Sequence, residues 1–340
     1  MNTVSSFLKP IAEDLFRLTL PVPFEGLGTV HAYLIRGKTG WAIIDTGMHA
    51  EGALERWQAA WNTLGIADSD IERIILTHVH PDHFGLAGWI QDRARRAGAM
   101  GEVPVLASAH ELELARVVFG RTWDDNRQAQ LDLFFRQCGL PTECRALVER
   151  VMPGIIRATH PHPTVVRALA YGETLEIGQR CFRVIHTPGH SDGHIILYDA
   201  NDGLVIAGDH ILPHISPNIG RWPASEPNPL GRYLGSLREL RALDVRIALP
   251  GHGRLIEDWP RRIDELLVHH QKRLGVMCGV AKQGATVFDV TCAAFDLATL
   301  NPGEIRFAIA ETLAHLEYLV HEGRLISSED SVWHYRRLAA

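Results

Sequence analysis

The chain has 340 residues, of which 46% are hydrophobic and 22% are charged, an ordinary balance for a globular protein. This composition excludes a disordered, collagen-like or coiled-coil chain, and the length suggests two domains or one large domain with an appendage. The formal net charge of -6 provides no overall basic field toward nucleic acid or acidic lipid.

The first part of the chain alternates predicted strands and helices. Short apolar runs bounded by turn residues predict strands at 30–35, 41–45, 71–76 and 103–107. Amphipathic spacing predicts helices at 51–64 and 84–97.

Residues 110–163 change to helical spacing, and β-like runs then return. The predicted strands are 174–177, 182–186, 195–199, 204–207 and 247–249, with a helix at 229–243. Two β-rich halves with interspersed helices favour an α/β sandwich, in which helices cover two packed sheets.

From residue 258 the pattern is helical almost to the end. The predicted helices are 262–282, 287–295 and 304–321, followed by a strand pair at 324–326 and 332–336. Three helices and a hairpin follow the winged-helix order, so we divide the chain into a main domain, 1–257, and a C-terminal winged-helix-like domain, 258–340. Residues 260–340 contain nine Lys or Arg against ten Asp or Glu. Nucleic acid is therefore a disfavoured partner, and we expect this domain to pack or to form a homodimer.

Four possible metal ligands follow the predicted strand 71–76 within six residues. They are His78, His80, Asp82 and His83 of the segment THVHPDH. Side chains at the end of a strand can converge on one point, and imidazoles with a carboxylate suit Zn²⁺ or another borderline first-row ion. The 19 histidines of the chain also favour a metal site.

Three further candidates lie beside glycines at the ends of later strands. They are His190 in TPGHSDGH, Asp209 in GDH and His252 in PGHG. Because glycine lets the backbone turn sharply, we expect these side chains to reach the same cleft as the first four.

The candidates lie in four motifs, which follow one another as THVHPDH, TPGHSDGH, GDH and PGHG, and a fifth motif, IIDTG (Ile43–Gly47), lies upstream. In this order the motifs resemble those of the metallo-β-lactamase fold superfamily, and the resemblance extends from about Val30 to Gly253. The resemblance implies an αββα sandwich with a dinuclear site at one edge. It assigns His78, His80 and His190 to a first metal, Asp82, His83 and His252 to a second, and Asp209 to both. It implies two Zn²⁺ per chain, with Fe or Mn as alternatives, and a hydrogen bond from a ligand histidine to Asp45.

Asp209 also reduces the number of activities that the resemblance implies for this chain. Zinc β-lactamases carry cysteine or serine there, whereas an aspartate resembles glyoxalase II, the lactonases, the thioesterase-like members and the metallo-ribonucleases. The resemblance implies that a metal-bridging hydroxide, oriented by Asp82 as the catalytic residue, hydrolyses a thioester or lactone of a small-molecule acyl substrate. Two alternatives stay open: a nuclease that acts on phosphodiesters, and a mono-iron enzyme similar to sulfur dioxygenases.

The helical block 110–163 is longer than in minimal members of this superfamily. It is either a lid, with Phe119, Trp123, Phe134 and Phe135 as an apolar roof, or a set of helices packed on the sandwich. The loop 213–220 after Asp209 is either a substrate wall or scaffold.

The remaining histidines are expected outside the metal site. We expect His194 to be structural and His210 to point away from the metals. We expect His31 and His49 to be packed or solvated and His186 to be a satisfied core histidine, and we expect four to lie at the surface: His160, His162, His269 and His270.

The sequence indicates a cytoplasmic protein. No stretch approaches the roughly 18 apolar residues of a membrane span, and residues 1–17 do not resemble a signal peptide. The five cysteines contain no CxxC pair, which is typical of free thiols in a reducing compartment.

Overall fold

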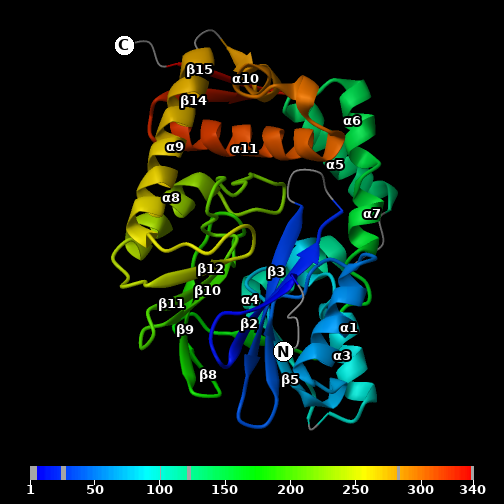
Figure 1. Ribbon diagram of the computed structural model, residues 1–340. Coiled ribbons are helices and arrows are strands. Elements are labelled where there is room, and N and C mark those ends of the chain that lie inside the picture. The colour runs from blue at the N-terminus through cyan, green and yellow to red at the C-terminus, as the bar shows by residue number, and fades with distance from the viewer. Residues whose placement is uncertain (1–5, 24–27, 100, 121–123, 282–283, 338–340) are drawn as a thin grey trace.

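The computed structural model describes residues 6–23, 28–99, 101–120, 124–281 and 284–337. Two sheets form the centre of the molecule, helices lie outside them, and the C-terminal helices lie with a small third sheet at one end (Figure 1). The predicted αββα sandwich is therefore confirmed.

The first sheet has seven strands in the order β1-β2-β3-β4-β5-β6-β7. Their bounds are β1 (Leu8–Pro10), β2 (Leu15–Pro21), β3 (Thr29–Arg36), β4 (Trp41–Ile44), β5 (Ile71–Ile75), β6 (Val105–Ser108) and β7 (Val166–Leu169). Strands β1 to β4 pair antiparallel, and β4 to β7 pair parallel. The sequence analysis did not predict β1, β2 or β7.

The second sheet has five strands in the order β12-β11-β10-β9-β8. Their bounds are β8 (Thr174–Ile177), β9 (Arg180–His186), β10 (Ile195–Asp199), β11 (Leu204–Gly208) and β12 (Ile247–Pro250). All pairs are antiparallel except β11 with β12, which is parallel. All five strands match predicted ones within a few residues.

Strand β4 shows why the central strands are apolar throughout. Ile44 faces the core between the two sheets, where it meets residues such as Phe182 and Leu197. Ile43 faces the opposite core, under α1 (Ala53–Leu64) and α3 (Ala87–Arg96). Because successive side chains alternate between the faces of a strand, a strand covered on both faces needs apolar residues at every position.

The predicted helix 84–97 corresponds to α3, and a separate short helix, α2 (Pro81–Phe84), precedes it. The break comes at Leu86, whose backbone N–H donates to Gly47 O at 3.0 Å and to Thr46 Oγ1 at 3.2 Å. These contacts fix the first helical turn after the His80 loop against the loop that follows β4.

In its described residues, which exclude 121–123, the insertion contains four helices and one π-helical segment, and they pack on the molecule. Its elements are α4 (Ala109–Leu114), η2 (Ala115–Phe119), α5 (Asp125–Gln137), α6 (Thr142–Glu149) and α7 (Met152–Arg157). Phe119, Phe134 and Phe135 are at most 5% exposed and lie in hydrophobic cores. These three residues therefore pack inside the molecule, the lid stays a prediction, and Trp123 lies outside the described residues.

The C-terminal region is a small domain with a three-stranded sheet. Its elements are α9 (Trp259–Val280), α10 (Val287–Ala294), α11 (Pro302–His321), β13 (Ala285–Thr286), β14 (Leu325–Glu329) and β15 (Trp333–Arg337). Helices α9 and α11 share one hydrophobic core with the second sheet and with α8 (Pro229–Leu240). Their predicted packing role is confirmed, whereas winged-helix character and dimer formation stay predictions. Within the described ranges, no helix is long and apolar enough to cross a membrane.

Candidate metal centre

The first four candidates lie on one short segment between β5 and α2. His78 and His80 are on the loop, and His80 is the residue directly before the helix. Pro81 is the first helical residue, a position where the missing backbone N–H costs nothing. Asp82 and His83 follow on the first turn, so the segment displays its ligands along both loop and helix.

The other three candidates come from loops that follow strands of the second sheet. His190 follows β9, Asp209 comes directly after β11, and His252 is two residues after β12. A Cβ atom on Gly251 would lie only 2.2 Å from Asp209 Oδ1 and 2.7 Å from His83 Cε1. Glycine at 251 therefore lets this loop approach the others closely.

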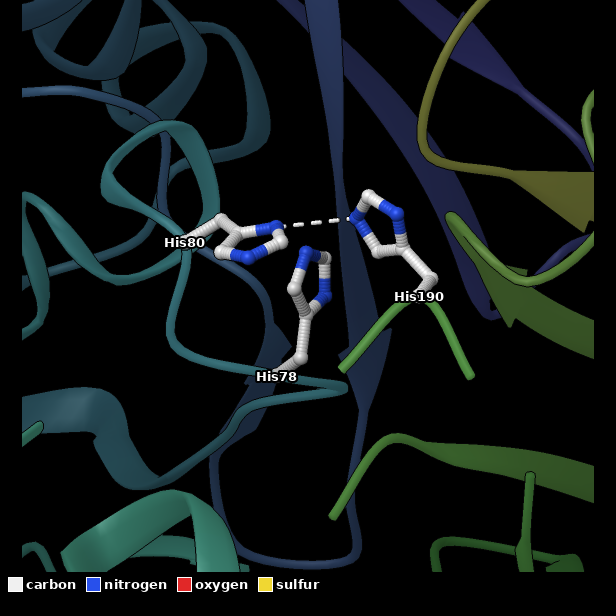
Figure 2. A group of neighbouring side chains, drawn as sticks. All are labelled: His78, His80 and His190. Carbon is white, nitrogen blue, oxygen red and sulfur yellow. Dashed lines mark hydrogen bonds between the residues drawn. The ribbon is translucent and has the colours of Figure 1, made fainter. Parts of the chain in front are cut away.

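The structure brings all seven candidate side chains together in three overlapping groups. Within each group the ligand atoms lie within 4.8 Å of one another. The groups are His78 with His80 and His190, His78 with His83 and Asp209, and Asp82 with His83 and His252. Figure 2 shows the first group, in which three imidazoles from two loops point toward one another and His80 Nδ1 lies 2.8 Å from His190 Nε2.

The ring nitrogens that face away from the centre are held by the protein. His83 Nδ1 donates to Asp45 Oδ2 at 2.9 Å, which confirms the predicted hydrogen bond to Asp45. His190 Nδ1 donates to the backbone carbonyl of Asn218 at 2.9 Å, and His252 Nδ1 donates to that of Thr29 at 2.6 Å. Such contacts fix the tautomer and turn the opposite nitrogen, with its lone pair, toward the centre.

Four inward atoms of this centre have no hydrogen-bond partner among the described residues. They are the Nε2 atoms of His78, His83 and His252, and Asp209 Oδ1. His83 Nε2 and Asp209 Oδ1 lie 3.3 Å apart without forming a hydrogen bond. Buried polar atoms left in this way are costly, and coordination of metal ions would satisfy all four at once. The donor set therefore fits metal ions.

The charges of the two halves of the centre differ. In the group of His78, His80 and His190, burial lowers the pKa of His80 to about 3 and holds that of His78 well below its usual range, so both rings are neutral and offer lone pairs. In the group of Asp82, His83 and His252, burial lowers the pKa of His252, but Asp209 and Asp82 outweigh burial and raise this pKa to about 10. Burial raises the pKa of Asp82, but His83 and His252 outweigh it and bring it to about 2.

Glu111 of α4 joins the two loops that carry the first group. One carboxylate oxygen accepts from the backbone N–H of Val79 at 2.8 Å, between His78 and His80. The other accepts from the Gly193 N–H at 2.9 Å and from the Ser191 hydroxyl, just after His190. Glu111 is fully buried, and burial raises its pKa to about 7. The sequence analysis missed this residue, because nothing local in its helix distinguishes it from a surface glutamate.

His194 and His210 lie near the centre but outside its three groups. His194 Nε2 accepts from the backbone N–H of Asp209 at 3.2 Å, and its Nδ1 contacts the Thr187 hydroxyl at 2.8 Å. Both ring nitrogens are therefore used, as expected of a structural histidine. His210 lies 2.6 Å from the Ser236 hydroxyl and packs on Tyr233, away from the three groups.

Most of the other histidines match the prediction, with one exception. The buried ring of His31 contacts Gly253 O at 2.7 Å, His186 contacts Asp192 O at 2.8 Å, and His49, His160, His162 and His269 are partly or fully exposed. The surface prediction was wrong for His270, which is fully buried and contacts Ser216 and His315. It lies on the inward face of α9 with Leu266 and Leu274, at the spacing of one helical face.

The loop 213–220 acts as scaffold at Asn218, the residue that holds His190. The Asn218 side-chain amide donates to Phe307 O at 3.2 Å and to Glu311 Oε2 at 3.1 Å, both on α11. The C-terminal domain therefore supports a candidate ligand through one intervening residue. Ile215 of the same loop is 50% exposed.

An αββα sandwich with histidines and aspartates converging from its strand ends defines a class of metal-dependent enzymes. Residues 26–252 match the Metallo-beta-lactamase superfamily, and residues 275–338 match the Metallo-beta-lactamase-like, C-terminal domain. The chain thus belongs to the metallo-β-lactamase superfamily, and within it the chain is a metal-dependent hydrolase.

Three relatives show how far the similarity extends. The chain is 26% identical to a probable metallo-hydrolase, YqjP, of Bacillus subtilis (strain 168) over 93% of this chain and 95% of that one. A solved metallo-beta-lactamase family protein of Thermus thermophilus is 33% identical with a TM-score of 0.81, covering 97% of this chain and 100% of that one. An atrochrysone carboxyl ACP thioesterase of Aspergillus fumigatus is 27% identical over 46% of this chain and 48% of that protein.

Proposed function

We propose that the chain hydrolyses a thioester or lactone of a small acyl substrate, using two divalent metal ions that we expect to be zinc, with iron or manganese as alternatives. The observation that carries this proposal is the central position of Asp209. Its Oδ1 lies 3.3 Å from His83 Nε2, and its Oδ2 lies 3.3 Å from His252 Nε2 and 3.8 Å from His190 Nε2. A carboxylate that faces both histidine groups is suited to hold two ions together.

The seven candidate residues would hold the two ions, and Asp82 has a further role in the reaction. Two bound ions supply a water of lowered pKa and a polarising charge for a carbonyl oxygen. His78, His80 and His190 would hold the first ion, and Asp82, His83 and His252 the second, with Asp209 between them. Asp82 stays ionised at neutral pH because its pKa is about 2, and its Oδ2 lies 3.2 Å from His252 Nε2. We assign it to orient the attacking water and accept its proton.

The preference for an acyl substrate has two supports. A relative that matches part of this chain is named as a thioesterase. The net charge of -6 and the acidic balance of the C-terminal region disfavour a polyanionic substrate such as RNA. A cytoplasmic location and a homodimer remain predictions, and light scattering of the purified protein tests the second.

Metal analysis combined with a substrate screen tests the proposed function. We expect two zinc ions per chain by elemental mass spectrometry, and hydrolysis of an acyl thioester or a lactone in preference to a bis-aryl phosphodiester. Turnover of the phosphodiester alone would favour the nuclease, and one iron per chain without hydrolysis would favour the dioxygenase-like alternative.

The variant Asp82→Asn tests the catalytic assignment within this screen. It keeps an oxygen ligand but cannot accept a proton, so we expect most of the metal to remain and kcat to fall by about 100-fold or more. The control Asp264→Asn removes an exposed carboxylate that pairs with Arg241, and it should leave both quantities unchanged. An unchanged rate for Asp82→Asn removes this residue from the mechanism.

A further inference from the structure

Arg306, in the second turn of α11, is a partly buried arginine without a carboxylate partner in the described part of the chain. Its guanidinium carbon lies 4.1 Å from the ring centre of Phe307 and 5.6 Å from that of Trp222. One terminal nitrogen lies 3.8 Å from Met152 Sδ, and the buried Nε has no hydrogen-bond partner among the described residues.

This environment is costly for a cation. Burial lowers the pKa of Arg306 to about 10, so the group still carries its charge at neutral pH. Cation–π contacts offset only part of the cost of holding a charge among apolar groups without a charged partner. Two arginines in the same region are paired: Arg221 with Glu317 at 3.2 Å and Arg273 with Glu311 at 3.1 Å. Pairing with an acid is therefore available in this part of the fold, yet Arg306 lacks it.

Hydrogen bonds link the helix segment that carries Arg306 to the candidate metal centre. It contacts Met152 of the insertion and Trp222 of the loop that follows Asp209, so three segments of the chain meet at its side chain. The carbonyl of the next residue, Phe307, accepts from the Asn218 side chain, and the Asn218 carbonyl accepts from His190 Nδ1. Two hydrogen bonds thus link the backbone beside Arg306 to a candidate ligand.

We propose that Arg306 binds an anionic group, a carboxylate or a phosphate, of the substrate that the metal centre hydrolyses. A guanidinium can donate two parallel hydrogen bonds to either group. Trp222, Phe307 and Met152 hold the cation and provide apolar contact for the adjoining part of the substrate. This inference rests on the proposed function and restricts it to acyl substrates that carry a negative charge away from the scissile bond.

Three matched thioesters test this role. S-butyryl-N-acetylcysteamine is neutral, its S-succinyl counterpart carries a carboxylate on the acyl side, and butyryl-coenzyme A carries phosphates on the thiol side. For Arg306→Met, we expect kcat/KM to fall 10- to 100-fold on one charged substrate and less than 2-fold on the neutral one. Loss on the succinyl compound identifies a carboxylate on the acyl group, and loss on the coenzyme A compound identifies a phosphate on the leaving group.

Two control variants separate this role from general effects. Arg261→Met removes an exposed arginine of α9 that pairs with Asp258 and Glu265, and it lowers the net charge equally. We expect it to leave all three substrates unaffected. Arg306→Lys keeps the charge without the planar fork and should recover part of the lost activity. Equal loss on charged and neutral substrates, or no loss on any, overturns the proposal.

A binding measurement tests whether Arg306 binds anions even if the protein hydrolyses none of the proposed substrates. Succinate and inorganic phosphate are titrated calorimetrically into the wild-type protein and into Arg306→Met. Because both proteins keep the same candidate metal ligands, a difference in affinity reports on Arg306 alone. We expect at least 10-fold weaker binding of one probe by the variant. Equal affinities, or no binding to the wild type, overturn the anion site independently of whether any thioester is cleaved.

Discussion

At the residue scale, hydrogen bonds to the outward ring nitrogens orient the histidines of the metal centre. Asp45, Asn218 and Thr29 accept from the outward nitrogens of three different histidines. Of the inward nitrogens, those of His83 and His252 have no hydrogen-bond partner in the described structure, and that of His190 contacts only His80 Nδ1. A site prepared in this way carries the cost of unsatisfied polar atoms until ions bind, and binding then stabilises the fold.

Asp209→Ala should convert this two-ion site into a one-ion site. Both groups lose the carboxylate that lies between them, 3.3 Å from His83 and His252 and 3.8 Å from His190, so less negative charge is left to offset the repulsion between two cations. We expect the metal content to fall from two ions toward one and turnover to be abolished, as measured by elemental analysis and thioester hydrolysis. The control Asp244→Ala removes an exposed carboxylate and should change neither. A variant that keeps two ions and full activity contradicts the bridging role.

At the scale of elements, Glu111 joins two ligand loops that belong to different sheets. Both carboxylate oxygens accept from backbone N–H groups, one in each loop. Glutamine has an NH₂ group in place of one oxygen, so one of these N–H groups loses its acceptor. We expect Glu111→Gln to lower metal affinity by about 10- to 100-fold, as residues that support ligands commonly do. Competition with a chelator measures this. Glu113→Gln, a change of an exposed residue of the same helix, is the matched control, and equal affinities for both variants contradict the role of Glu111.

The raised pKa of Glu111 predicts that the free energy of unfolding depends on pH. Burial raises the pKa of Glu111 from 4.5 to about 7, so folding takes up a proton between these values. The stability contributed by this group is therefore present at low pH and lost as the pH rises through 7. Relative to Glu111→Gln, which cannot titrate, the metal-free wild type should lose about 2 kcal/mol between pH 5 and pH 7. Urea unfolding at several pH values tests this, and parallel curves argue against it.

Elements differ in how well local sequence predicts them. Strands such as β4 and β10 are buried on both faces, and their unbroken apolar runs were recognised. Strand β7 was missed because three of its four residues are exposed, which leaves no apolar pattern. The seven candidate ligands could be identified because each lies in a short motif, whereas Glu111 and Asn218 act through contacts between residues 28 to 93 positions apart. Long-range contacts of this kind leave no local signal.

At the scale of the whole molecule, the C-terminal helices complete the core of the second sheet. Leu316 of α11 is fully buried in the cluster that contains Val205 of β11 and Trp259 of α9. The two regions that match separate family descriptions, residues 26–252 and 275–338, therefore share one hydrophobic core. We expect them to unfold together, because neither can bury its apolar face without the other.

Leu316→Ala tests this cooperativity. The substitution should destabilise the whole protein by about 2–5 kcal/mol, the usual cost of a cavity in a packed core. Tryptophan fluorescence and release of bound metal should report the same lowered urea midpoint, because α11 also supports His190 through Asn218. Val276→Ala, at a 52% exposed position of α9, should shift neither signal appreciably. If metal stays bound in Leu316→Ala while a separate transition reports loss of the C-terminal helices, the two regions are independent units and the shared core does not couple them.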